Sequence, residues 1–294
     1  MTVDITFITL TWNSQAYVRR CLDSIMQRCA TDGLNVEVIV VDNGSRDESV
    51  RILEEFREDH PDSVTLIALD RNRGTTWTRN LAMKRARGRF LCVLDSDTEF
   101  LSGSLRPVLS LLSEDRQLAI VAPRLILPDG SVQHSAKRFP SFLDKLRKVP
   151  RILFRREVPT TDFYASFPFR RRTCVDTAIS ACWVFRADLL DSVGLLDEQI
   201  FYAPEDLDYS ARIREAGLYI AYEPGLTLLH HTQQVSHRRP LSSLSLSHLK
   251  GLVRYHRKHG GWFTRPDALA TPWPSRAGAT ERWAVGLSRE ATWS

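Results

Sequence analysis

Two carboxylates, Asp95 and Asp97, stand one residue apart directly after the apolar run 90–94. This run, with Gly88 before it, is typical of a buried strand. Negative charge at the end of a buried strand is costly unless a cation or a bound ligand compensates it. Oxygen ligands on one short turn suit Mg²⁺ or Mn²⁺, and these ions keep coordination positions for substrate phosphates. The alternative interpretation is that the two aspartates cap a loop and a following helix.

A second acidic group follows Pro204, where Glu205, Asp206 and Asp208 occupy three of four positions. Proline opens helices, and acidic residues are favoured in the first turn of a helix by its dipole. The dipole explains any one of these residues, but it does not explain three acids within four positions after an aromatic pair. The group is therefore a candidate functional site, with the helix start as the structural alternative.

His230 and His231 follow the last short strand that the pattern predicts. A single histidine is more often structural than a ligand, yet imidazole is a common ligand of borderline divalent ions. The sequence pattern therefore leaves His230 open as a structural residue or as a metal ligand.

The elements that must position these residues alternate between strand and helix from residue 4 to residue 97. This alternation predicts an α/β fold with a mostly parallel sheet flanked by helices. The predicted strands are 4–12, 36–41, 64–69, 90–97, 118–127, 178–186, 218–223 and 226–229. Helices are predicted from Ser14, as the N-cap, and over residues 75–86, 104–115, 187–193, 204–217 and 241–259, with one more around Leu53 and Phe56.

Polar residues follow three of these strands, at 11–14, at 42–45 and at 95–97. The carboxyl ends of parallel strands lie on one edge of a sheet, so these residues should line one cleft suited to a nucleotide. For Asp42 the alternative is an Asx-turn, in which its side chain accepts hydrogen bonds from its own loop.

The 294 residues, 43% of them hydrophobic, suffice for one large α/β domain or two small ones. The predicted organisation is a single domain over residues 1–263, with a nucleotide-binding half (1–100) and an acceptor half (101–263), and a poorly ordered tail at 264–294. The five cysteines form no C-x-x-C pair, so reduced thiols and a cytoplasmic location are expected. We expect no signal peptide and no membrane span.

The net charge of +5 is concentrated in residues 137–172, where eleven Lys and Arg face three Asp and Glu, a local balance of +8. Phe142, Leu146, Val149 and Leu153 recur there at helical spacing. A basic amphipathic segment predicts peripheral contact with the inner face of a membrane. A basic flap that binds the acceptor is the next interpretation, and a solvated surface helix is the structural one.

Several ordered motifs together resemble the family 2 glycosyltransferases of the GT-A fold, over roughly residues 4–231. The matching segments are 11–13, 41–47, 72–74 with Arg79 and Asn80, 95–97, and 205–206 with Arg212. In detail the chain is similar to bacterial rhamnosyltransferase-like enzymes of surface polysaccharide synthesis. Ser180, Ala181 and Cys182 depart from the Gly-Ala of relatives, which leaves the identity of the acceptor open.

The resemblance implies an inverting, metal-dependent transferase for rhamnose, a hexose or an N-acetylhexosamine. The donor would be a dTDP- or UDP-linked sugar, and the acceptor a glycan or a lipid-linked acceptor. Asp206 would be the general base with Glu205 beside it, and Asp95, Asp97 and His230 would hold Mg²⁺ or Mn²⁺. The remaining implied site residues are Thr11, Asn13, Asp42, Asn72, Gly74, Arg79 and Asp95 for the nucleotide sugar, with Asp42 facing the base, and Trp183 and Arg212 for the acceptor.

Two other classes of function compete with this one. A nucleotidyltransferase usually carries a Gly-rich, basic phosphate loop after its first strand, and residues 11–14 are not such a loop. A non-catalytic basic module would bind membrane or nucleic acid, but no RRM, KH or zinc-finger pattern is present. We therefore expect no nucleic-acid partner.

Overall fold

The structure is a computed structural model that describes residues 2–143, 164, 166–232 and 243–263. Its strands are β1 (Ile5–Thr11), β2 (Val36–Asp42), β3 (Val64–Ala68), β4 (Phe90–Asp95), β5 (Thr98–Ser102), β6 (Leu118–Ile126), β7 (Ala136–Lys137), β8 (Thr173–Val175), β9 (Thr177–Ala178), β10 (Cys182–Arg186) and β11 (Tyr219–His230). Its helices are α1 (Val18–Asp32), α2 (Ser49–Asp59), α3 (Thr75–Met83), α4 (Leu105–Glu114), α6 (Leu189–Ser192), α7 (Glu205–Glu215) and α9 (Ser243–His259). The predicted tail at 264–294 and most of the basic segment 137–172 lie outside the described residues.

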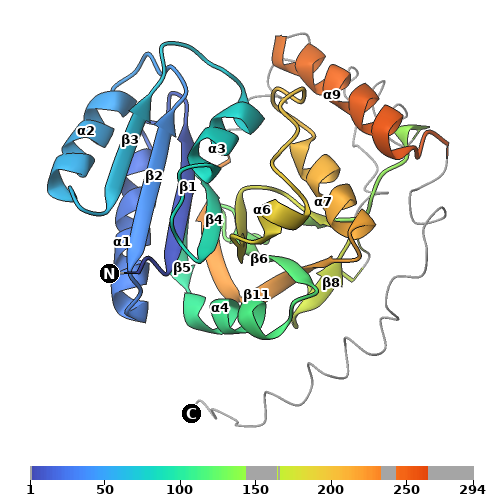
Figure 1. Cartoon of the computed structure of the whole chain (residues 1–294), viewed down its shortest axis with the longest axis horizontal. Helices are drawn as coiled ribbons and strands as arrows, with labels where there is room; N and C mark the ends of the chain where they lie inside the picture. Colours follow the sequence, from blue (N-terminus) through green and yellow to red (C-terminus); the bar gives the residue numbers. More distant parts are fainter. Residues whose placement is uncertain (1, 144–163, 165, 233–242, 264–294) are drawn as a thin grey trace.

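One large sheet connects both halves of the described chain, in the order β3-β2-β1-β4-β10-β6-β11-β5, with β8 also paired to β11 (Figure 1). Strands β3, β2, β1 and β4 are parallel, as the alternation of strands and helices predicts. Strand β10 runs antiparallel to both β4 and β6, whereas β6 and β11 are parallel. The α/β class is therefore confirmed, and the parallel arrangement holds for the first half while the second half is mixed.

Helices cover both faces of this sheet, so its central strands are apolar on both sides. On one face α1, α2 and α4 contribute side chains such as Leu22, Phe56 and Val108 to the core. On the other face α3, α6 and α7 pack against β1, β4 and β10, and Trp183 and Tyr209 lie in that second core. Helix α9, the last one within the described residues, lies against α7 (Figure 1).

Polar contacts as well as apolar ones fix α9 on α7. Asp208, on the inner side of α7, is 1% exposed and accepts hydrogen bonds from Lys258 Nζ (2.8 Å) and His259 Nε2 (2.9 Å) of α9. Burial by itself would raise the pKa of Asp208, but the hydrogen bonds from His259 and Lys258 and the charge of Arg212 hold it well below its ordinary value. The third acid of the motif is thus a structural anchor between two helices.

Some local expectations are wrong for tertiary reasons. The strand expected over 178–186 is interrupted at residues 179–181, and the two short strands expected over 218–229 form one strand with a register shift between Glu223 and Thr227. Strand β5, directly after the Asp95–Asp97 turn, was not predicted. Ser14 does not cap α1, whose N-cap is Tyr17, because its Oγ lies 2.9 Å from Ser96 Oγ.

Candidate active site at the carboxyl edge of the sheet

The polar ends of β1, β2 and β4 converge on one edge of the sheet, as the sequence predicts. Thr11 is opposite Asp42 in the β1–β2 register, and Leu10 is opposite Asp95 in the β1–β4 register. The Thr11 hydroxyl donates to Asp42 Oδ1 over 2.9 Å. The loops after β1 and β4 are joined by the contact between Ser14 and Ser96. The polar residues at this edge thus belong to one connected group of turns.

Asp42 is 1% exposed and uses its carboxylate within its own loop. Its Oδ1 accepts from the hydroxyls of Thr11 and Ser45, and its Oδ2 accepts from the backbone N–H groups of Gly44 (3.1 Å) and Ser45 (2.9 Å). Four donors fill the acceptor positions of a carboxylate. The structure therefore agrees with the Asx-turn interpretation of Asp42, whose side chain shapes the loop, and its contact with a nucleotide base stays a prediction.

Asn72 and Gly74 form a second turn at this edge. Asn72 Oδ1 accepts from Asn43 Nδ2 (3.0 Å) and from the backbone of Gly74 (2.9 Å). Gly74 has φ +87°, and a Cβ there would collide with the carbonyl oxygen of Phe201, so this position requires glycine. Asn13 stabilises the loop after β1 in a similar way, since its Oδ1 accepts a hydrogen bond from the backbone N–H of Arg46 at 2.8 Å.

Arg79 is the buried centre of the site. Its side chain is 3% exposed, and its Nη2 contacts Asp95 Oδ1 at 2.5 Å. Its Nη1 contacts Glu205 Oε1 at 3.1 Å and donates to Ser180 Oγ at 2.8 Å. One guanidinium from α3 therefore joins the end of β4, the break before β10 and the first residue of α7. Ser180 lies in this break, and both its Oγ and its carbonyl oxygen accept hydrogen bonds from Arg79.

Glu205 and Asp206 have different surroundings although they are neighbours. Glu205 is 7% exposed, and its Oε1 accepts from Arg79 and from the Ser180 hydroxyl (2.8 Å). Burial and then the charge of Asp206 raise the pKa of Glu205 to about 7, although Arg79 acts in the opposite direction. Asp206 is half-buried, and its Oδ1 accepts from the backbone N–H of Leu207 at 2.8 Å. Of the two carboxylates, Asp206 is therefore the more accessible to a second substrate.

Asp95, Asp97 and His230 come together from β4, the following turn and the end of β11. One ligand atom from each lies within 4.8 Å of the others, and His230 Nε2 is 3.4 Å from Asp97 Oδ1. The second ring nitrogen, Nδ1, is 2.7 Å from Gln133 Oε1, a contact that fixes the orientation of the ring. Two carboxylate oxygens and an imidazole nitrogen fit a divalent ion such as Mn²⁺, with the carboxylates supplying the hard ligands.

The charges around this group are consistent with that fit. Burial raises the pKa of Asp95, and the charge of Asp97 adds to this, while Arg79 lowers it. Burial lowers the pKa of His230, but its hydrogen bond to Asp97 and the charge of that carboxylate outweigh burial, so the pKa of His230 lies above its usual value. Each carboxylate thus disfavours the negative charge of the other, which is the situation that a bound cation relieves.

The structure does not bring Trp183 and Arg212 to this edge. Trp183 is 1% exposed in the second core, stacks on Tyr209 at 5.8 Å and donates its Nε1–H to the carbonyl of Ala178. Arg212 pairs with Asp208 at 3.0 Å and donates to the carbonyl of Val193. A buried indole and an engaged guanidinium offer no surface to an acceptor, so both assignments are corrected to structural roles.

Two site residues were not predicted from the sequence, namely Ser180 beside Arg79 and Gln133 beside His230. Ser180 was noted only as a departure from the pattern of relatives. Gln133 lies 97 positions from His230, and no local signal connects the two.

The comparisons with known proteins agree with this fold. A family model described as "Glycosyl transferase family 2" matches residues 6–194, and the chain belongs to this family. The central sheet, flanked by helices and carrying the acidic turn at its edge, has the GT-A fold, and the protein is a glycosyltransferase. No helix in the described residues combines the length and apolar character needed to cross a bilayer.

Among its relatives is the N-acetylglucosaminyl-diphospho-decaprenol L-rhamnosyltransferase of Mycobacterium tuberculosis, which is 26% identical over 278 residues, 90% of this chain and 88% of the relative. The succinoglycan biosynthesis protein ExoO of Rhizobium meliloti is 26% identical over 85% of this chain and 66% of its own length.

Two solved structures share the fold at low sequence identity. The mannosyltransferase PcManGT of Pyrobaculum calidifontis, in complex with GDP-Man and Mn²⁺, has a TM-score of 0.58 at 18% identity over 98% of this chain and 77% of that one. GalNAc-T7, with UDP, GalNAc and Mn²⁺, has a TM-score of 0.66 at 16% identity over 95% of this chain. This chain spans 53% of the GalNAc-T7 chain.

Proposed function

We propose that this glycosyltransferase is inverting and metal-dependent, and that it moves a sugar from a nucleoside-diphosphate donor to a lipid-linked glycan. The observation that carries the proposal is the Arg79 junction. This guanidinium binds Asp95, one of the candidate metal ligands, and Glu205 at the start of α7. Asp206 follows Glu205 directly and forms no ion pair within the described residues, so its carboxylate is available to act as a general base.

In the proposed reaction Asp206 accepts the proton of an acceptor hydroxyl. The hydroxyl oxygen then forms a bond to the anomeric carbon, while the bond from that carbon to the diphosphate oxygen breaks and its electron pair leaves with the diphosphate. A divalent ion, when bound, neutralises negative charge on the departing diphosphate. A single displacement from the face opposite the leaving group inverts the configuration, as in water attack by inverting glycosidases.

The chain's own residues hold the parts of this reaction in place. Asp95, Asp97 and His230 would bind the ion. The turns shaped by Thr11, Asn13, Asp42, Asn72 and Gly74 would receive the nucleotide. Arg79 fixes the distance between the two ends of the site, because a buried guanidinium with three partners has little freedom to move.

The mycobacterial relative is named as a rhamnosyltransferase that acts on a diphospho-decaprenol acceptor, which supports transfer of rhamnose to a lipid-linked acceptor by this chain. The donor in this proposal is a dTDP- or UDP-linked sugar. A lipid-linked acceptor also supports peripheral contact with a membrane through the basic segment 137–172. In this proposal residues 1–100 form the nucleotide-binding half and residues 101–263 the acceptor half.

The test is incubation with a panel of nucleotide sugars, with release of the nucleoside diphosphate measured with and without Mn²⁺. We expect release with a dTDP- or UDP-linked sugar, stimulated by a lipid-linked glycan and lost in EDTA. Full activity in EDTA contradicts the metal assignment. Release of pyrophosphate in place of a nucleoside diphosphate would identify a nucleotidyltransferase.

A further inference from the structure

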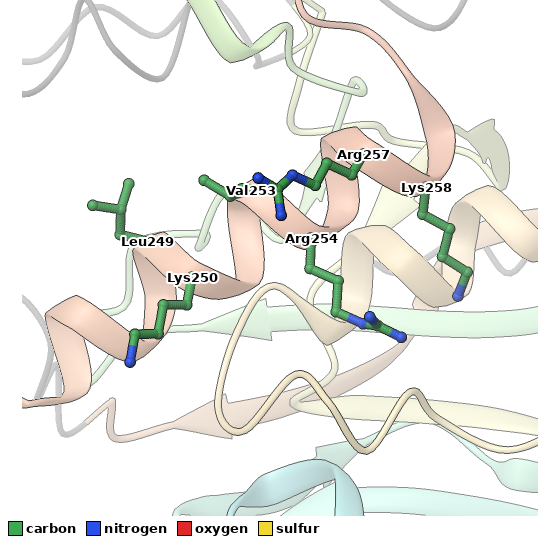
Figure 2. A pocket seen from close by; sticks show the side chains of 6 residues that line it. All are labelled: Leu249, Lys250, Val253, Arg254, Arg257 and Lys258. Atoms are coloured by element: carbon green, nitrogen blue, oxygen red, sulfur yellow. The ribbon is translucent and has the colours of Figure 1, made fainter.

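We propose that the outward face of α9 docks on the surface of an anionic membrane. Five residues of α9 share this face, because the spacing of positions 246, 249, 250, 253 and 257 places them within an arc of about 100° on a helix. They are Leu246, Leu249, Lys250, Val253 and Arg257. Figure 2 shows the last four of these side chains projecting from α9, together with Arg254 and Lys258, where they line a shallow hollow.

The apolar members of this face are exposed to an unusual degree for their size. Leu246 is 56% exposed and Leu249 is 50% exposed, and Phe263, just beyond the end of the helix, is 84% exposed. The opposite side of α9 is by contrast buried against the protein at Leu252 and Tyr255. The helix is thus apolar on both sides, although only one side has a partner among the described residues.

The charges on this face decide what kind of partner fits. The sequence of α9 contains no Asp or Glu. Arg254 and Lys258, at its border, are engaged in ion pairs, Arg254 with Asp197 at 2.8 Å and Lys258 with Asp208 at 2.8 Å and Asp197 at 3.4 Å. Lys250 and Arg257 form no ion pair within the part of the chain that the structure describes. Two uncompensated cations among exposed leucines are complementary to a surface that offers anions above hydrocarbon, which is the surface of an anionic bilayer.

The position of α9 gives this docking a consequence for the reaction. Gly251 packs directly on the backbone before α7, and a Cβ there would collide with the carbonyl oxygen of Ala203 and approach Pro204. The outer face of α9 is therefore about one helix diameter, roughly 10 Å, from the turn that leads into Glu205 and Asp206. A bilayer on this face would therefore lie about one helix diameter from the start of α7, which would bring a lipid-linked acceptor near the site, a consequence that rests on the proposed function.

The test is cosedimentation of the whole protein with vesicles of phosphatidylcholine alone and of equal parts phosphatidylcholine and phosphatidylglycerol. We expect binding to the mixed vesicles that falls with added salt, and little binding to the neutral ones. In the double variant Lys250→Gln/Arg257→Gln the partition coefficient should fall by roughly 25-fold, about fivefold for each basic residue near the surface. Leu246→Gln/Leu249→Gln should also reduce binding at low salt.

The matched control is Arg57→Gln/Arg116→Gln, which changes the net charge equally at two exposed positions away from α9, one in α2 and one after α4 (Figure 1). It should leave vesicle binding within about twofold of the wild type, because surface charges act within a Debye length. Basic segment 137–172 is intact in every variant, so any contact that it makes is constant across the series.

The proposal is overturned if the wild type does not bind mixed vesicles, or if the α9 variants bind as the wild type does. Equal losses in the α9 variant and the control would also overturn it, since net charge would then be the cause. The variant Leu246→Gln/Leu249→Gln separates a membrane from a soluble polyanion. If it binds both vesicles and a soluble anionic polymer as the wild type does, the face is a polyanion site and not a membrane-docking face. If vesicle binding follows the prediction but the protein transfers no sugar, the membrane-docking face is supported and only the proposed function is contradicted.

Discussion

The substitution Asp206→Asn tests the assignment of the general base. The structure allows a conservative replacement, because Asn keeps an oxygen that can accept from the Leu207 N–H and Asp206 forms no ion pair with the residues that the structure describes. Loss of a general base typically lowers turnover by about 10²- to 10⁴-fold, or roughly 2.7 to 5.4 kcal/mol in activation free energy. The free energy of unfolding should change by only about 0.3 to 1 kcal/mol, the contribution of an acidic residue in the first turn of a helix.

The assay is steady-state sugar transfer at saturating donor, with nucleotide affinity measured separately by calorimetry. A base contributes mainly in the transition state, so kcat should fall while nucleotide affinity stays nearly unchanged. The control is Glu205→Gln, in which the amide oxygen can still accept from Arg79 and Ser180. This neighbour should lose much less turnover than Asp206→Asn.

Two results would refute this reasoning. If Glu205→Gln shows the larger loss of kcat and Asp206→Asn the smaller, then Glu205 is the base in spite of its burial. If Asp206→Asn weakens nucleotide binding and spares turnover at saturation, this carboxylate binds the donor or supports the fold.

Three further predictions follow from single residues. Asp97→Ala should abolish sugar transfer and leave the thermal midpoint of unfolding within about 2 °C of the wild type. The control Asp129→Ala, in an exposed turn, should be fully active. Undiminished transfer by Asp97→Ala contradicts the assignment of Asp97 as a metal ligand. The pKa of Glu205 is about 7 in the folded state and about 4.3 in an unfolded chain, so the free energy of unfolding of the wild type should fall by up to about 3 kcal/mol as the pH rises from 4.3 to 7. Urea unfolding of Glu205→Gln in EDTA should lack this dependence on pH. An equal dependence in both proteins refutes the raised pKa of Glu205. Asp208→Asn should cost about 3 to 5 kcal/mol, as for removal of one partner from a buried ion pair, while Asp23→Asn, in an exposed pair, should cost less than about 1 kcal/mol; calorimetric melting of both variants distinguishes the two.

Local signals in the sequence determined much of this protein. The alternation of strand and helix predicted the parallel half of the sheet, because burial on both faces requires continuous apolar strands. Acidic residues at the ends of such strands predicted the carboxylate edge, and the motifs predicted the family. These properties are readable from sequence because each depends on residues that are close in the chain.

Only the tertiary structure decided which candidate residues belong to the site. The partners Arg79 and Glu205 are 126 positions apart, and their contact exists because α3 and α7 meet at the same sheet edge. The same packing made Trp183 a core residue and engaged Arg212 with Asp208, so that their chemistry is not available to a substrate. The physical reason is that burial and charge compensation depend on which groups come within a few ångströms of one another, and local spacing does not encode such contacts.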